Sequence, residues 1–140
     1  MNRKMTLTTA AMAVVLGLSI VAANEKAPAD YVAAMKGINS TNMQIGQAIA
    51  AKDYAAIEAG AATLKGHADV TAKFWAAKKV DDAIKSAADL SKAVADLAAA
   101  AKAKDDAGIA AAQTAKGATC RTCHTAHRSE KLADGTYEIK

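Results

Sequence analysis

The chain has 140 residues, of which 18 are lysine or arginine, 14 are aspartate or glutamate and 52% are hydrophobic. This length fits one domain with a single modest core. The basic residues form no stripe with interleaved aromatic side chains, so we expect no nucleic-acid partner. We find no paired carboxylates, no nucleophile–base arrangement and no phosphate-binding glycine loop, so we expect the protein not to be an enzyme.

The first 23 residues have the pattern of a secretory signal peptide. A short basic start at Arg3 and Lys4 precedes an uncharged run that ends in small residues. Its strongly apolar part is shorter than the roughly 20 residues of a membrane-spanning helix, although an uncleaved anchor is the alternative. We therefore expect residues 1–23 to be removed and residues 24–140 to form one mature domain. The protein is then expected to be periplasmic, with no membrane attachment after cleavage.

The first predicted helix of the mature domain covers residues 29–51. The mature chain contains one proline, is rich in alanine and lysine and lacks runs of β-branched residues, a composition that favours helix. In this segment the inward positions recur at spacings of four and three residues, as one face of a helix requires. They are Tyr31, Met35, Ile38, Asn42, Ile45 and Ile49.

Three further helices are expected. The second follows Asp53, a suitable N-cap, and ends near Trp75; the third carries apolar residues over 84–101, and the fourth begins near Asp105. The segments KDYAAI (52–57) and KDDAGI (104–109) share Lys-Asp-x-Ala-x-Ile, and each lies where one helix should end and the next begin. Because short connections join antiparallel neighbours, the sequence predicts an all-α fold. We expect an antiparallel up-down four-helix bundle with two similar corners.

The fourth helix contains the segment GATCRTCHTAHR (117–128), which holds both cysteines and two of the three histidines. Cys120, Cys123 and His124 form the pattern C-x-x-C-H, the sequence signature of c-type haem attachment. On a helix, positions i, i+3 and i+4 share one face, so two thioether bonds and an iron–imidazole bond can be made from one side. We expect one haem c, covalently bound by Cys120 and Cys123, with His124 as the proximal iron ligand.

A zinc site and a disulfide are the alternatives for this cluster. Cys120, Cys123, His124 and His127 could supply the four ligands of a tetrahedral zinc site, but structural zinc sites usually take their ligands as two separated pairs. A disulfide between the cysteines suits an exported protein but leaves His124 without a role. An exported zinc or copper binder is therefore the remote alternative.

An exported four-helix bundle whose C-x-x-C-H lies near the C-terminus resembles the class II c-type cytochromes, which are cytochrome c prime and its low-spin relatives. That family usually continues C-x-x-C-H-x-x with tyrosine or phenylalanine and then arginine or lysine. Here CHTAHR keeps the base as Arg128 and places His127 where the aromatic residue normally lies. The resemblance implies that Arg128 lies near the haem and that the first helix faces its distal side.

The sixth coordination position separates two functions. The resemblance implies that a methionine of the first helix gives a six-coordinate, low-spin electron carrier. A non-bonding side chain gives a five-coordinate haem that binds nitric oxide or carbon monoxide. Met35 lies on the inward stripe and is the candidate distal ligand, Met43 lies one position off it, and filling the core is the alternative role of both. We expect an electron-transfer protein, and gas binding is the alternative function. Its partner is expected to be a redox protein of unknown identity. The protein could also form a homodimer.

Two features outside the cluster carry simpler expectations. His67, in the second helix beside Gly66, is expected at the surface. The tail LADGTYEIK (132–140) has a turn signal at Asp134-Gly135 and alternating residues after it. We expect the tail either to lie back over the bundle as a short extended arm or to fray.

Overall fold

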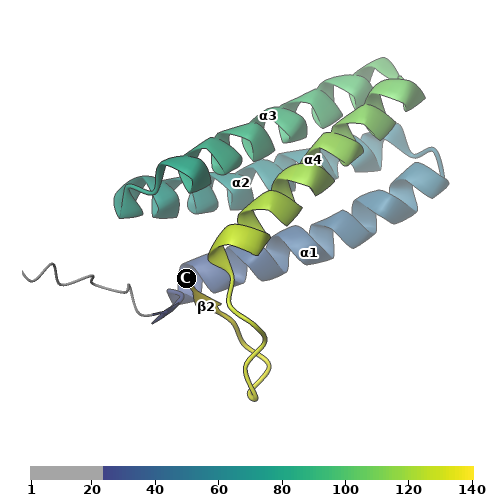
Figure 1. The fold of residues 1–140 in the computed structure, drawn as a ribbon. Coiled ribbons are helices and arrows are strands. Elements are labelled where there is room, and N and C mark those ends of the chain that lie inside the picture. Colours follow the sequence, from purple (N-terminus) through teal and green to yellow (C-terminus); the bar gives the residue numbers. More distant parts are fainter. Residues whose placement is uncertain (1–23) are drawn as a thin grey trace, which may run out of the picture.

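The computed structural model describes residues 24–140, which form four helices and one short pair of strands (Figure 1). The helices are α1 (Ala29–Ala50), α2 (Tyr54–Lys78), α3 (Asp81–Ala103) and α4 (Asp106–His127). The strands β1 (Glu25–Lys26) and β2 (Glu138–Ile139) pair antiparallel. The predicted all-helical fold class is thus confirmed for this part of the chain. The predicted signal peptide over residues 1–23 lies outside the described residues.

The helices pack against one another in chain order, α1 on α2, α2 on α3 and α3 on α4. α1 and α4 approach each other much less closely, although both border the same side of the molecule in Figure 1. The arrangement is compatible with the expected antiparallel up-down four-helix bundle. None of the helices within residues 24–140 is long and apolar enough to cross a membrane.

The corners α1–α2 and α3–α4 are built in the same way. Lys52 and Lys104 adopt left-handed backbone conformations with φ of 53° and 54°. The N–H groups of the following Asp53 and Asp105 each donate a 2.9 Å hydrogen bond to a carbonyl of the preceding helix, which closes its last turn. Each aspartate carboxylate then accepts a 3.0 Å hydrogen bond from the backbone N–H three residues further along and caps the next helix. The repeated Lys-Asp-x-Ala-x-Ile therefore marks two equivalent corners, as predicted.

The second helix is longer than the sequence pattern indicates. It was expected to end near Trp75, but α2 continues to Lys78. Ala76, Ala77 and Lys78 are good helix formers, and no proline or glycine interrupts them. The helix ends at Lys79, whose φ of 57° is left-handed.

The core consists of two hydrophobic clusters. The central cluster lies between the middle parts of the helices, and its largest fully buried side chains are Ile45, Ile57, Leu64 and Leu97. The aromatic cluster is made of Tyr31, Trp75, Ala83, Ala87 and Ile139, with the partly buried Phe74 against it. Many central positions are alanine, which contributes less burial free energy than a leucine-sized side chain.

The C-terminal tail returns to the bundle as an extended arm. Glu25 pairs with Ile139 in the β1–β2 ladder, and the Lys140 N–H donates a 3.1 Å hydrogen bond to the His127 carbonyl. Ile139 is buried within the aromatic cluster. Of the two expectations for the tail, the extended arm is confirmed, because burial of Ile139 fixes the end of the chain.

Candidate functional site

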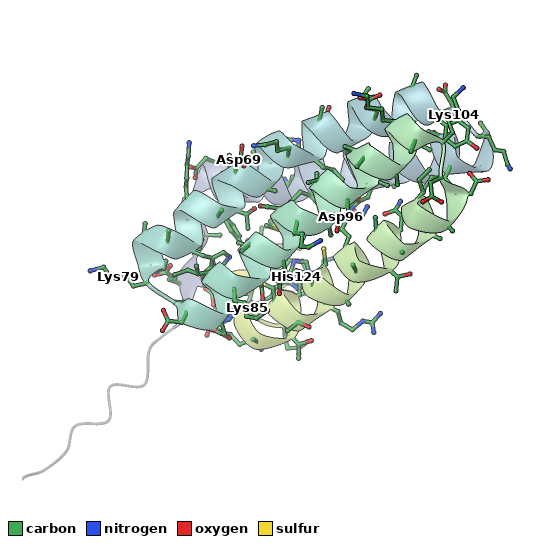
Figure 2. The ribbon with its side chains drawn as sticks, turned by 90° about the horizontal axis from the view of Figure 1, so that it is seen from above. Asp69, Lys79, Lys85, Asp96, Lys104 and His124 are labelled. Atoms are coloured by element: carbon green, nitrogen blue, oxygen red, sulfur yellow. The ribbon has the colours of Figure 1, made fainter. Side chains whose placement is uncertain are left out.

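Cys120, Cys123 and His124 share one face of α4. The helix is unbroken through the motif and ends at His127. All three side chains are half-buried, whereas the intervening Arg121 and Thr122 are exposed. Figure 2 shows His124 on the side of α4 that faces the other helices. This is the placement that the C-x-x-C-H spacing predicts.

The two cysteines are free thiols that contact different parts of the core. Cys120 packs against the central cluster and Cys123 against the aromatic cluster. Burial raises the pKa of the Cys120 thiol and raises the pKa of Cys123 to about 11. Both sulfurs are therefore protonated at neutral pH, and neither is joined to the other.

The His124 imidazole is held in its neutral form. Burial lowers the pKa of His124, and the nearby Arg128 guanidinium lowers it further. A neutral imidazole has a free nitrogen lone pair, which is the form that binds metals. His124 can therefore supply a metal ligand from the same helical face that presents the two thiols.

Met35 of α1 packs against both core clusters. Its side chain is half-buried and packs against the central cluster, which Cys120 contacts, and against the aromatic cluster, which Cys123 contacts. Met43, the other methionine considered as a distal ligand, is 59% exposed. Of the two, Met35 is the one that packs against the core, and its role as a distal ligand stays a prediction.

The inward stripe of α1 is shifted from the predicted one. Its buried side chains include Ala34, Thr41 and Ala48, while the predicted Met35, Asn42 and Ile49 are only half-buried. The small side chains share the buried face with Tyr31, Ile38 and Ile45, and the three half-buried side chains lie at its edge. Asn42 at this edge reaches α4, where its Oδ1 accepts a 2.6 Å hydrogen bond from the Lys116 ammonium.

His127 contacts Asp82 and Trp75, beside the aromatic cluster that Cys123 also contacts. Its Nε2 lies 2.9 Å from Asp82 Oδ2, and its ring centroid is 4.9 Å from that of Trp75. Within residues 24–140, no three or more histidine, cysteine, aspartate or glutamate side chains gather to hold a metal ion. The zinc alternative therefore finds no preformed set of four ligands in this part of the chain.

Arg128 lies immediately after α4 and contacts the tail. Its side chain is exposed, and its guanidinium carbon is 4.5 Å from the centroid of the Tyr137 ring, a cation–π distance. Its backbone N–H donates to the His124 carbonyl and closes the last turn of the helix. The expected place of Arg128 near a haem stays a prediction.

His67 is not the surface histidine that the sequence suggests. It is half-buried, and its ring lies against Gly37 of α1 so closely that a β-carbon at Gly37 would overlap the imidazole. The expectation was wrong because glycine leaves room for an imidazole between the two helices. This contact depends on how α1 and α2 pair, which the local sequence around His67 does not show.

Lys116 is the site residue that the sequence analysis missed. It is the only charged side chain among the buried residues of the described chain, with 5% of its surface exposed. Its pKa is lowered by burial. A signal was present in the sequence, because Ile109, Ala112, Lys116 and Cys120 follow the three- and four-residue spacing of one helical face.

The donor set around α4 fits a covalently attached haem. Two free thiols and a neutral imidazole share one face, Met35 of α1 packs against the same two clusters as the thiols, and the buried Trp75 Nε1 has no hydrogen-bond partner within the described residues. Comparison of the chain with protein-family models, with curated proteins and with solved structures gave no match. The assignment of the site therefore depends on the spacing of the residues and on their geometry.

Proposed function

We propose that the protein is an exported, periplasmic monohaem c-type cytochrome that acts in electron transfer. The observation that supports this most is the common half-buried face of Cys120, Cys123 and His124 on α4. The C-x-x-C-H spacing serves two thioether bonds and one axial ligand, and this face presents both sulfurs and the imidazole to the interior of the bundle.

Different residues would attach the cofactor and bind its iron. Cys120 and Cys123 fix it to α4, and His124 supplies the proximal ligand. Met35 would supply a thioether from α1, which approaches α4 less closely than α3 does. A ring attached to α4 can therefore face α1 without separating a closely packed pair of helices. When bound, the haem would supply one-electron exchange between ferric and ferrous iron.

The two clusters would set the surroundings of the iron. Met35 packs against both the central and the aromatic cluster, so apolar side chains would line that part of the cofactor's surroundings. Low polarity and a histidine–methionine ligand pair both raise the reduction potential of a haem. These residues therefore favour an electron carrier.

A five-coordinate haem that binds nitric oxide or carbon monoxide is the second candidate. It is favoured by the contacts of Met35 with both clusters, because methionine commonly fills gaps in a core without binding a metal. The two candidates differ in whether the Met35 sulfur binds the iron.

Absorption spectra of the purified protein, oxidised and then reduced, test the proposal. An electron carrier should show a haem spectrum that survives denaturation and extraction with organic solvent, because the thioether bonds are covalent. The ferric form should be low-spin. A high-spin ferric spectrum with ready binding of carbon monoxide would support the second candidate, and the absence of any haem spectrum would contradict both.

A further inference from the structure

Lys116 places a positive charge between α1 and α4. Its ammonium group has three donors, and its hydrogen bond within the described residues goes to Asn42 Oδ1 at 2.6 Å. None of the ion pairs formed within residues 24–140 includes Lys116, whereas Lys52, Lys65, Lys85 and Lys92 all pair with aspartates. Lys116 is thus the most buried charged side chain within residues 24–140, and no carboxylate of these residues pairs with it.

An uncompensated buried cation is costly. Moving an ammonium ion out of water into a protein interior is unfavourable even after relaxation, and one amide acceptor offsets only part of the cost. The titratable neighbour that acts on the pKa of Lys116 is the Cys120 thiol, and burial keeps that thiol protonated and neutral. A second, anionic partner would account for a lysine at this position.

The position of Lys116 identifies the class of anion. It lies on α4 one helical turn before Cys120, on the same inward face, and Asn42 holds its ammonium from α1. A haem attached at Cys120 carries propionate carboxylates on the same rigid ring. We propose that Lys116, oriented by Asn42, binds a haem propionate at the α1–α4 interface, an inference that rests on the proposed cytochrome function.

The test compares Lys116 variants of the haem-loaded protein. Lys116→Met removes the charge and keeps most of the volume. Lys116→Gln also removes the charge but keeps a side chain that can hydrogen-bond to Asn42. Lys102→Met is the control, because Lys102 is exposed in the last turn of α3. The measurements are the midpoint potential as a function of pH and the guanidinium concentration at half-unfolding.

We expect both Lys116 variants to acquire a pH-dependent potential. Without the cation, the buried propionate becomes harder to ionise, so its pKa rises. Ionisation then stabilises ferric iron, and the potential should fall below that of the wild type as pH rises and converge with it at low pH. The half-unfolding concentration should also fall in both variants, while Lys102→Met should match the wild type in both measurements.

Two results would overturn the inference. A Lys116→Met protein whose potential runs parallel to the wild type across pH, or which is more resistant to guanidinium, would show that the lysine pairs with no propionate. A Lys116→Gln protein indistinguishable from the wild type would show that only the hydrogen bond to Asn42 matters. In each case the haem would still be attached, so the proposed function would stand. A protein without covalent haem would remove both proposals together.

Discussion

His127 and Asp82 join the end of α4 to the start of α3 through a 2.9 Å contact between Nε2 and Oδ2. The His127 side chain is only 14% exposed, and its ring packs on Trp75. The resemblance to class II c-type cytochromes leads one to expect tyrosine or phenylalanine at this position. His127 instead packs on an aromatic ring and also bonds to a carboxylate. Its contacts lie on α2 and α3, beside the aromatic cluster that Cys123 also contacts.

We therefore expect His127→Tyr to retain its haem and to shift the reduction potential only modestly. His127→Phe should keep the packing on Trp75 and lose the bond to Asp82, which lowers the free energy of unfolding by at most about 1 kcal/mol, since Asp82 is largely exposed. Haem content by absorbance and unfolding in denaturant are the measurements. Asp82→Ala should reproduce the stability loss without adding to it in the double variant. Loss of the haem spectrum in His127→Tyr would mean that His127 is a ligand.

Gly37 and Gly46 of α1 form a matched pair for testing the α1–α2 contact. At Gly46 an added β-carbon meets no atom within 4 Å, so Gly46→Ala should stabilise the protein by about 0.5–1 kcal/mol through helix propensity. At Gly37 the same β-carbon would overlap the His67 ring, so Gly37→Ala should be less stable than Gly46→Ala. Adding His67→Ala should relieve the overlap. Equal unfolding free energies for the two glycine variants would show that His67 does not lie on Gly37.

The raised pKa of Tyr31 predicts that the protein loses stability at alkaline pH. Burial, with a smaller effect from the neighbouring Cys123, raises the pKa of Tyr31 to about 12. In the unfolded chain the phenol ionises near its ordinary value of 10, so the unfolded state releases its proton first as pH rises. The protonated Tyr31 phenol therefore makes its full contribution to the free energy of unfolding below pH 10. That contribution is lost between pH 10 and about 12.

The measurement for Tyr31 is the free energy of unfolding across this pH range. Tyr31→Phe should remove much of the alkaline decline, because phenylalanine keeps the ring contacts and has no proton to lose. Tyr137→Phe is the control, since Tyr137 is exposed in the tail. A Tyr31→Phe protein with the same alkaline decline as the wild type would contradict the burial of this phenol.

The two helix corners and the helical face of the motif could be predicted from the sequence because both depend on local spacing. Lys52-Asp53 and Lys104-Asp105 make their bonds within a few residues along the chain. The C-x-x-C-H face follows from helical periodicity alone. The end of α2 was predicted less well, since alanine and lysine fit both a helix and a polar connection.

The contacts between helices could not be predicted in the same way. Periodicity indicated that Met35 and Asn42 lie on the inner stripe of α1 but not which edge of the stripe they occupy. A lysine is normally assigned to solvent, and the burial of Lys116 depends on Asn42, which is distant in sequence. His67 is likewise explained only by Gly37 on the facing helix. In each case the decisive neighbour lies on another helix.

Met35 decides between an electron carrier and a gas binder. If its sulfur binds the iron, the ferric protein should show the weak near-infrared band of a low-spin histidine–methionine haem. Met35→Leu should abolish that band and allow carbon monoxide or nitric oxide to bind. Met43→Leu is a matched control, because Met43 is 59% exposed on the same helix, and its spectrum should equal that of the wild type. An unchanged low-spin spectrum in Met35→Leu would assign the sixth ligand to another residue.

Covalent attachment of haem to Cys120 and Cys123 is tested most directly by the intact mass of the protein. The protein should be isolated from the periplasm of cells able to make c-type cytochromes. The expected mass is that of a chain beginning near Asn24 plus one haem, and the haem should be absent when both cysteines are replaced by alanine. A mature chain of the same length without haem would contradict the account.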